Sequence, residues 1–487
     1  MDKRIHIVTT LSHISQRDEL IEQAPYIDLI EVRADLMKNA FEVKEFTSIP
    51  TIYVLKSTKY GGHFEGSLKA RHELLLKAVE HFDFIELEVE HDLTRRLLRH
   101  IPKQKRRIAW YGSQPYYETL LDRFEKMVQT PASIYKLVLQ NLDAYSIAPL
   151  IRLLNNYKNN DLVAYATGPS TEWSQVLSPF LGAPEAHTVL TQGSETDTHF
   201  TPRRLTEDYG LPHRNNVEQL FGIVGTPVLG SISPKLHNVA YRSLNLPYLY
   251  LPFEVPDFVS FKKEFMDNPN KLPIPLKGLT VVAPFKEAAY SNSKYKEITN
   301  NIYAMACNGV VKSGNGWRGF STDAFGALAA LERLNPIWQH QKIAIVGCGG
   351  AGRSIAVSLQ RKNQYITLVN RTEAKGKEIA DSLNLSFVPL EKFNASHFDI
   401  IIHATPLGKK NGETPFDITL LQPHATVIDH VYALENDTTL IKHCLDTGIK
   451  CTDGKEIARL QIGQQFKYMT GLEMPVYENK TQKVKVY

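Results

Sequence analysis

The chain is poor in cysteine, nearly balanced in charge and free of long apolar runs. It has four cysteines in 487 residues, and none of them belongs to a Cys-x-x-Cys pair. So few disulfides could not hold together a chain of this length, so we expect reduced, mostly buried thiols and predict no metal site.

The charge balance and the lack of apolar runs limit the possible partners. The 56 basic and 52 acidic residues leave a net charge of +4, spread along the chain, so no nucleic-acid partner is expected. Residues 1–8 contain too short an apolar run for a signal peptide, and no later run could span a bilayer. The sequence therefore predicts a soluble cytoplasmic protein without a membrane partner.

The residue pattern predicts several α/β domains. Short β-branched or aromatic runs alternate with longer amphipathic stretches, as in parallel sheets covered by helices. The length of the chain exceeds what one hydrophobic core usually organises. In the N-terminal part we expect a helix at 68–81 and strands at 5–9, 29–33, 51–55, 84–88, 108–111, 134–137 and 162–166. Seven or eight such units fit a (β/α)8 barrel.

A charged segment with two prolines, residues 201–216, interrupts this rhythm. We place a domain boundary near residue 214, because a new strand follows at 221–224. A second α/β unit is expected to run to about Asp323, and a third to begin with the strand at 342–346.

That last strand leads into a glycine turn that predicts a dinucleotide site. Gly347, Gly349 and Gly352 have the spacing Gly-x-Gly-x-x-Gly, with Gly350 and Ala351 between them, and a helical stretch follows at 354–360. Such glycines allow the tight turn, the approach of a pyrophosphate and close helix packing, while the helix N-terminus attracts the negative charge.

The end of the next strand favours NADP over NAD. An NAD enzyme usually has an acidic residue there for the ribose hydroxyl, whereas this chain has Asn370-Arg371-Thr372. A guanidinium can pair with the 2′-phosphate of NADP, and the two polar neighbours can add hydrogen bonds. A solvated surface arginine is the alternative.

Several ordered motifs between residues 221 and 471 resemble the shikimate dehydrogenase family, which pairs a substrate domain with a smaller NADP-binding domain. One motif is Gly225-x-Pro227 followed by Ser231-Ile-Ser233-Pro-Lys-Leu-His-Asn. The resemblance implies that the hydroxyls of Ser231 and Ser233 bind the substrate carboxylate. Two hydroxyls at this spacing could equally cap the following helix.

The same resemblance indicates the catalytic residues. The segment 278–287 is similar to the family's strand-to-helix segment with the catalytic lysine, here Lys286, and Asn308 and Asp323 match the remaining substrate-binding pair. A lysine and an aspartate in a dry cleft suit alcohol oxidation, because a proton must leave the hydroxyl as hydride moves to the nicotinamide. Lys286 would exchange that proton with the reacting oxygen, and Asp323 would orient the lysine.

Later motifs complete the resemblance. Residues 400–408 resemble the strand and loop that pass the nicotinamide, and the closing motifs imply that Tyr432 and Gln461 contact substrate. Four positions depart from the family pattern: Thr280, Val282, His403 and Lys409. Because Val282 removes a hydroxyl near the substrate, we expect weaker shikimate binding or a preference for a related compound.

The N-terminal part resembles type I 3-dehydroquinate dehydratase, itself a (β/α)8 barrel. Glu31-Val-Arg33-Ala-Asp35 is similar to its substrate-binding signature, and Lys136 falls where that family has its Schiff-base lysine. The resemblance implies substrate contacts by Glu31, Arg33 and Lys56. An amine condensed with the ketone would acidify the neighbouring C–H and let water leave. A lysine that merely closes a barrel strand is the alternative.

The barrel also departs from that family at its acid/base group. The family's proton-shuttling histidine should lie near Trp110-Tyr111-Gly112-Ser113, and none stands there. The later arginine appears as Gln175, the earlier one as Lys56 and a glutamate as Tyr60. Loss of an acid/base group slows proton transfer by about a hundredfold or more.

Together these resemblances imply a fusion of two consecutive enzymes with small-molecule substrates. The dehydratase product of 3-dehydroquinate is 3-dehydroshikimate, which the dehydrogenase reduces to shikimate. The predicted ranges are 1–213 for the barrel, 217–325 with about 456–487 for the substrate domain, and 326–455 for the NADP-binding Rossmann domain. Two alternatives remain open: only the dehydrogenase is active and the barrel is a scaffold, or the chain is a non-catalytic quinate or shikimate sensor.

Overall fold

The computed structural model describes residues 4–140, 145–158, 160–168, 170–191, 200–213, 216–296, 304–408, 410, 412–431 and 437–475. The chain divides into two compact units, 1–276 and 277–487, and each is described by itself. The three domain ranges expected from the sequence remain a prediction. No helix in the described part of the chain has the length and apolar character that a bilayer crossing requires.

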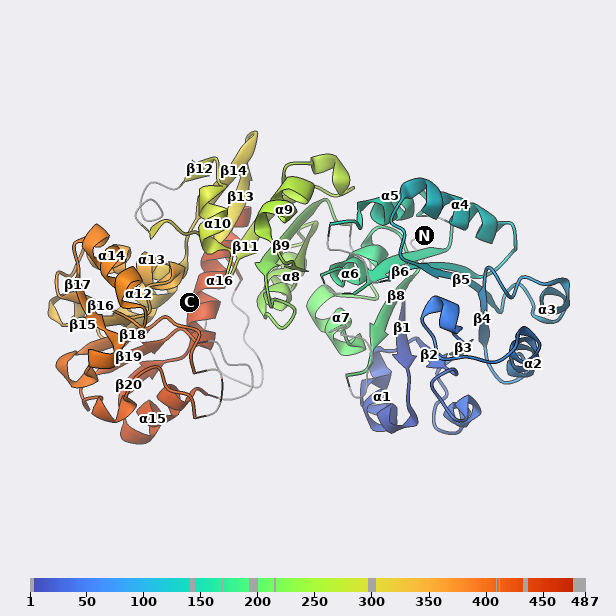
Figure 1. The fold of residues 1–487 in the computed structure, drawn as a ribbon, viewed down its shortest axis with the longest axis horizontal. Helices are drawn as coiled ribbons and strands as arrows, with labels where there is room; N and C mark the ends of the chain where they lie inside the picture. Colours follow the sequence, from blue (N-terminus) through green and yellow to red (C-terminus); the bar gives the residue numbers. More distant parts are fainter. Residues whose placement is uncertain are drawn as a thin grey trace. The chain divides into compact units, whose positions relative to one another are not determined.

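Eight parallel strands form a nearly closed barrel in unit 1 (Figure 1). The strands are β1 (His6–Leu11), β2 (Leu29–Arg33), β3 (Thr51–Val54), β4 (Phe84–Glu88), β5 (Arg106–Gly112), β6 (Ile134–Gln140), β7 (Leu162–Thr167) and β8 (Glu185–Val189). Their order in the sheet is β7-β6-β5-β4-β3-β2-β1-β8. The predicted barrel is confirmed, and β8 adds a strand that the sequence pattern did not single out.

Amphipathic helices connect the strands and cover their outer side. They are α1 (Arg17–Gln23), α2 (Leu68–Ala78), α3 (Arg95–His100), α4 (Tyr117–Val128), α5 (Ala148–Asn156), α6 (Trp173–Phe180) and α7 (Pro202–Tyr209). In α4 the buried Leu120, Phe124 and Met127 recur at helical spacing, which gives the helix one apolar face. Ser67 begins α2 by accepting a hydrogen bond from the backbone N–H of Ala70, as N-cap residues do.

The inside of the barrel changes character along its strands. Val8, Leu29, Ile52 and Val54 form an apolar cluster there, with Phe84 packed against it. Side chains two residues apart in a strand share a face. In β2 the residue two positions after the inward-facing Leu29 is Glu31, so Glu31 also points inward, nearer the strand C-terminus. The barrel therefore has an apolar floor below a polar interior.

The remainder of unit 1 begins a second sheet. β9 (Gln219–Gly225) and β10 (Tyr248–Glu254) pair in parallel, and α8 (Ser233–Ser243) connects them. The amide of Asn238 fastens α8 to β10, because Nδ2 donates to the backbone oxygen of Tyr250 and Oδ1 accepts from its N–H.

Unit 2 starts with four strands that hold the proposed catalytic residues at their ends. β11 (Leu276–Val281) pairs antiparallel with β13 (Gly309–Ser313), β13 pairs with β14 (Gly316–Phe320), and β14 pairs with β12 (Tyr295–Lys296). The helices α10 (Lys286–Ser291), α12 (Asp323–Leu334) and the C-terminal α16 (Gly454–Thr470) belong to the same unit.

A six-stranded parallel sheet follows in unit 2. Its strands are β15 (Ile343–Val346), β16 (Ile366–Asn370), β17 (Ser386–Pro389), β18 (Ile400–His403), β19 (Thr426–Asp429) and β20 (Lys450–Thr452), and its helices include α13 (Gly350–Leu359), α14 (Glu373–Leu383) and α15 (Thr439–Thr447). The order β17-β16-β15-β18-β19-β20 is that of a dinucleotide-binding Rossmann sheet. In such a sheet the strands are added first to one side and then to the other, and this change occurs between the first strand, β15, and the fourth, β18.

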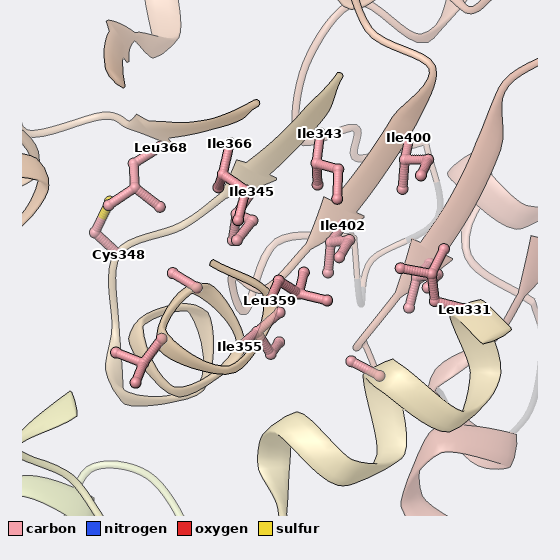
Figure 2. Packing of buried hydrophobic residues seen from close by; sticks show 14 of the residues in the cluster. Leu331, Ile343, Ile345, Cys348, Ile355, Leu359, Ile366, Leu368, Ile400 and Ile402 are labelled. Atoms are coloured by element: carbon pink, nitrogen blue, oxygen red, sulfur yellow. The ribbon is translucent and has the colours of Figure 1, made fainter. Parts of the chain in front are cut away.

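The core of this sheet fixes the position of α13. Figure 2 shows Ile343 and Ile345 of β15 and Ile400 and Ile402 of β18 on the side of the sheet that faces Ile355 of α13. All five side chains are buried. The helix that follows the glycine turn is therefore held against the centre of the sheet, where the strand order reverses.

Candidate active sites

The glycine turn joins β15 to α13 and leaves room for a ligand. Gly347 has φ +112°, a conformation that L residues with a side chain rarely adopt. An added Cβ at Gly352 would lie 1.9 Å from the carbonyl oxygen of Gly347, whereas nothing lies within 4 Å of one at Gly349. The turn is therefore closed towards the protein and open at Gly349. The first turn of α13, which includes Ala351, directs free N–H groups towards this open side.

The polar residues after β16 lie beside this turn. Asn370 Oδ1 accepts a hydrogen bond of 3.3 Å from the backbone N–H of Cys348, and its Nδ2 donates to the backbone oxygen of Thr372. The side chains of Arg371 and Thr372 are exposed. These residues fit the adenosine end of NADP, because an exposed guanidinium at this position can reach a 2′-phosphate.

Four predicted site residues of unit 2 meet around one carboxylate. Lys286, the first residue of α10, donates to Asp323 Oδ2 at 2.6 Å. Asn308, just before β13, donates to Asp323 Oδ1 at 2.9 Å. Gln461 of α16 donates to the backbone oxygen of Asp323 at 3.4 Å. Asp323 is almost fully buried, while the Lys286 side chain keeps 19% of its surface exposed, so the amine is the part of the cluster that a substrate can reach.

This cluster adjoins the glycine turn. An added Cβ at Gly350 would lie 3.5 Å from the Cβ of Lys286 and 3.1 Å from that of Ala306. The catalytic candidate and the start of α13 are thus in van der Waals contact range within one unit.

The structure assigns a structural partner to His403, which the sequence marked only as a departure. Its Nδ1 lies 2.9 Å from Asp429 Oδ1 and its Nε2 lies 2.5 Å from Thr405 Oγ1. Because an ionised carboxylate only accepts, Nδ1 donates to Asp429, while Nε2 makes the contact with the Thr405 hydroxyl. Thr438 also donates to Asp429. His403 therefore orders the loop that begins at Ala404.

The other predicted residues of the dehydrogenase belong to unit 1, make other contacts, or fall outside the described residues. Ser231 and Ser233 belong to unit 1, and Ser231 Oγ accepts a 3.2 Å hydrogen bond from the backbone N–H of Ser233, the first residue of α8. The N-cap of α8 is Ile232, which makes no side-chain cap hydrogen bond, so this contact does not confirm the capping alternative. Tyr432 and Lys409 lie outside the described residues. Thr280 donates to Gln465.

In unit 1 the proposed Schiff-base lysine lies between two carboxylates. Lys136 of β6 is buried, and its Nζ donates to Glu31 Oε2 of β2 at 2.7 Å. It also lies 2.5 Å from Glu86 Oε2 of β4. Burial would lower the pKa of Lys136, but the charges of Glu31 and Glu86 outweigh it and raise that pKa well above its ordinary value. The resting amine is an ammonium ion.

Further cations face the same space. Lys56 is buried with its Nζ 4.2 Å from the centre of the Tyr111 ring. Burial, together with the charges of Arg33 and Lys136, lowers the pKa of Lys56 to about 8. Arg33 makes a two-bond ion pair with Asp35, at 2.9 and 2.8 Å. Glu31, Arg33, Lys56 and Lys136, all predicted from the sequence, are thus brought to the barrel interior.

Sequence reasoning missed several residues of this interior. Tyr111, on β5 where a histidine was sought, donates from its hydroxyl to Glu86 Oε1 at 2.6 Å. Deeper in the barrel Arg107 pairs with Glu185. His187 of β8 lies 3.3 Å by Nε2 from Glu185 and 3.7 Å by Nδ1 from Glu31. The sequence does contain a sign of this polar interior, because charged residues alternate with apolar ones along β4 and β8.

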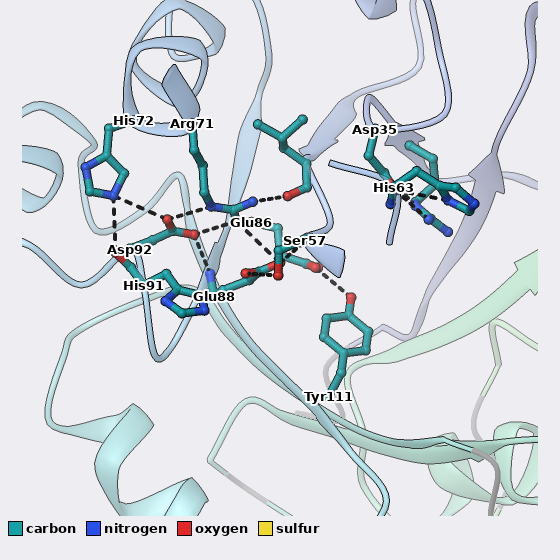
Figure 3. Close-up of polar contacts among 12 residues, drawn as sticks. Asp35, Ser57, His63, Arg71, His72, Glu86, Glu88, His91, Asp92 and Tyr111 are labelled. Carbon is teal, nitrogen blue, oxygen red and sulfur yellow. Dashed lines mark hydrogen bonds and ion pairs between the residues drawn. The ribbon is translucent and has the colours of Figure 1, made fainter. Parts of the chain in front are cut away.

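A second polar network braces the barrel wall. Figure 3 shows Arg71 of α2 directed at Asp92, while Glu88 binds Ser57 and Tyr111 reaches Glu86. Arg71 makes two bonds to Asp92, at 2.8 and 2.7 Å. This network fixes the end of β4.

Three family models match successive segments of the chain. A family model described as type I 3-dehydroquinase matches residues 5–216. The shikimate dehydrogenase substrate binding domain matches 223–308, and a shikimate / quinate 5-dehydrogenase model matches 329–410.

Curated relatives match one half or nearly all of the chain. A shikimate dehydrogenase (NADP(+)) of Thermococcus kodakarensis is 33% identical over 260 residues, which are 52% of this chain and 92% of that protein. A bifunctional 3-dehydroquinate dehydratase/shikimate dehydrogenase of Arabidopsis thaliana, named chloroplastic, is 24% identical over 481 residues, 92% of this chain and 78% of that protein.

Solved structures give similar coverage. The Thermus thermophilus shikimate 5-dehydrogenase, in complex with NADP(H) and shikimate, is 27% identical with a TM-score of 0.47, over 53% of this chain and 95% of that one. The dehydroquinate dehydratase and shikimate dehydrogenase from S. pombe AroM is 21% identical with a TM-score of 0.43, over 97% of each chain.

Proposed function

The chain belongs to the shikimate dehydrogenase family, and we propose that it catalyses two consecutive steps. Its barrel dehydrates 3-dehydroquinate to 3-dehydroshikimate, and its C-terminal half reduces that product to shikimate with NADPH. The observation that carries the reduction is the Lys286 and Asp323 pair in contact range of the glycine turn.

The reduction needs a proton donor at the carbonyl oxygen. NADPH supplies the hydride when it is bound. Lys286 Nζ donates to the carbonyl oxygen and gives it a proton as the alcohol forms. Asp323 holds that amine in place, and Asn308 holds Asp323 through its second oxygen. In the reverse direction the same lysine accepts the hydroxyl proton.

Further binding residues are proposed from the family resemblance. Asn370, Arg371 and Thr372 receive the 2′-phosphate, and the N-terminus of α13 receives the pyrophosphate. By that resemblance Ser231 and Ser233 bind the substrate carboxylate, and Gln461 and Tyr432 contact the substrate. NADP is the cofactor, as the names of the bacterial and archaeal relatives state for those proteins.

The barrel forms a Schiff base at Lys136. A buried amine with carboxylates on both sides, at the position expected for the nucleophile, supports this chemistry. The scaffold and sensor alternatives leave this arrangement without a role. A cytoplasmic location remains a prediction of the sequence.

The dehydrogenase is tested with shikimate and NADP. Wild-type protein should produce the absorbance of reduced cofactor, and Lys286→Ala should lower kcat by about a hundredfold or more, because the proton acceptor is lost. Lys277→Ala, at a lysine on β11, is the matched control. No turnover by the wild type would reject the assignment.

The barrel is tested by borohydride reduction in the presence of 3-dehydroquinate. Reduction of an iminium leaves a stable adduct, and a peptide map should find it on Lys136. Protein that neither dehydrates 3-dehydroquinate nor forms this adduct would leave the barrel as a scaffold.

A further inference from the structure

The barrel lacks the expected histidine on β5, yet its chemistry needs a group that moves protons at Lys136. The carboxylates and rings near the amine in the described part of the chain include Glu31, Glu86 and the phenols of Tyr111 and Tyr165. His187 approaches Glu31 rather than Lys136. The choice among them depends on which group is free when the amine becomes an imine.

Glu31 and Glu86 contact Lys136 differently. The Lys136 Nζ makes an aligned hydrogen bond to Glu31 Oε2. Glu86 Oε2 lies 2.5 Å from the same nitrogen, but within the described structure this oxygen has no aligned hydrogen-bond partner, and Glu86 is only 3% exposed. An ammonium ion has three N–H groups and can satisfy both carboxylates, whereas an iminium has one.

We propose that Glu86, oriented by Tyr111, is the general acid and base of the barrel, so that a carboxylate does the work of the missing histidine. The inference rests on the proposed dehydratase function. When the imine forms, Glu31 keeps the aligned N–H and Glu86 Oε2 is released. Tyr111 still donates to Glu86 Oε1 at 2.6 Å and keeps the free oxygen directed at the reacting atoms.

Tyr111 itself is unsuited to that task. Burial, reinforced by the charge of Glu86, raises the pKa of the Tyr111 phenol well above its ordinary value. The phenol therefore keeps its proton and serves as a donor. We assign it as a positioning residue.

The proton balance closes without any other reactant than water. Lys136 passes one proton to Glu86, and the amine attacks the ketone carbon while the carbonyl oxygen takes a second proton from the nitrogen. The new hydroxyl leaves as water with the proton from Glu86, and the C=N bond forms. Glu86 is then a carboxylate again.

The elimination uses the same oxygen. Glu86 takes the proton from the carbon next to the iminium, and the C–H electron pair forms an enamine. The enamine expels the hydroxyl of the following carbon, which leaves as water with the proton returned by Glu86. Hydrolysis of the conjugated iminium then releases the product and restores the Lys136 ammonium ion.

The test uses the full-length protein and the mass of the borohydride-trapped adduct. In the wild type, adducts at Lys136 should include the product form, which is lighter than the substrate form by one water. Glu86→Gln should lower kcat for dehydration by about a hundredfold or more. It should form its adduct more slowly than the wild type, and the adduct that is trapped should be mainly the heavier substrate form. An adduct at Lys136 also shows that the variant barrel is folded, because the Schiff base at this residue requires an assembled site.

Matched variants distinguish the loss of an acid/base group at Glu86 from a general loss of buried charge. Glu88→Gln, on the same strand and face, should keep turnover within about threefold, because Asp92 still pairs with Arg71. His187→Gln tests the rival histidine and should also keep turnover. Tyr111→Phe, which preserves the ring, should lose about tenfold in kcat and enrich the substrate adduct.

Each result decides the question. Wild-type turnover in Glu86→Gln, or loss of turnover in His187→Gln alone, overturns the inference and leaves the dehydratase function standing. If Glu86→Gln forms no adduct at all, wild-type turnover in Tyr111→Phe overturns it. Wild-type protein with neither turnover nor adduct rejects the barrel function and this inference together.

Discussion

At the scale of single residues, sequence reasoning found the groups that carry chemistry but not all their partners. Lys136, Lys286 and Asp323 were recognised by motif. Glu86 and Tyr111 were not assigned, although a charged residue on the inward face of a strand is costly unless it is paired or used. Their significance depends on a contact between strands, which residue type alone does not reveal.

Lys56 gives a residue-scale prediction about pH. Its pKa is lowered to about 8 by burial and by neighbouring cations, so it is charged below that pH and neutral above it. If it holds the substrate carboxylate, the KM for 3-dehydroquinate should rise as pH increases from about 7 to about 9, with less change in kcat.

Lys56→Arg is the control for that measurement. A guanidinium stays charged throughout this range, so the variant should show a KM that does not rise with pH. A wild-type KM that is constant across the range would contradict a carboxylate contact by Lys56.

At the scale of elements, local patterns predicted most strands and the turn. β2 and β4 coincide with the expected ranges, and the helix expected at 68–81 ends at Ala78 in the structure. β8 escaped notice because Glu185 and His187 break its apolar run. Glu185 is buried in an ion pair with Arg107, and His187 lies beside Glu185 inside the barrel. A strand pattern reveals neither contact.

The glycine turn gives a prediction at this scale. In Gly352→Ala the new methyl group would overlap the Gly347 carbonyl oxygen, 1.9 Å away, so α13 must move from the sheet. We expect a loss of stability of about 1–3 kcal/mol and weaker NADPH binding, measured by thermal unfolding and by fluorescence titration.

Gly349→Ala is its counterpart. No atom lies within 4 Å of the added carbon, so the melting temperature should stay that of the wild type while the Kd for NADPH rises, because the methyl group occupies the approach of the pyrophosphate. Equal melting temperatures and equal Kd values for all three proteins would show that the turn does not bind cofactor.

At the scale of the whole molecule, the chain combines a lyase barrel with a reductase, and the product of the barrel is the substrate of the reductase. With 3-dehydroquinate and NADPH, wild-type protein should oxidise the cofactor. Lys136→Ala and Lys286→Ala should each fail alone, because each lacks one step. A mixture of the two variants should restore NADPH oxidation after a lag, since a small product released from one chain can reach the other.

That mixing experiment has two informative controls. Lys136→Ala should still oxidise NADPH when 3-dehydroshikimate is supplied, and Lys286→Ala should still dehydrate 3-dehydroquinate. A mixture that stays inactive although both controls work would contradict free release of the intermediate.

The sequence by itself determined the α/β class, the barrel, the glycine turn and the choice of NADP, because each depends on residues close together in the chain. Only the tertiary structure decided which side chains meet. Lys136 and Glu31 are 105 residues apart and Lys286 and Asp323 are 37 apart. Barrel closure and sheet packing bring such residues into contact, and strand stagger selects which inward side chains face one another. The proposed role of Glu86 depends on that selection.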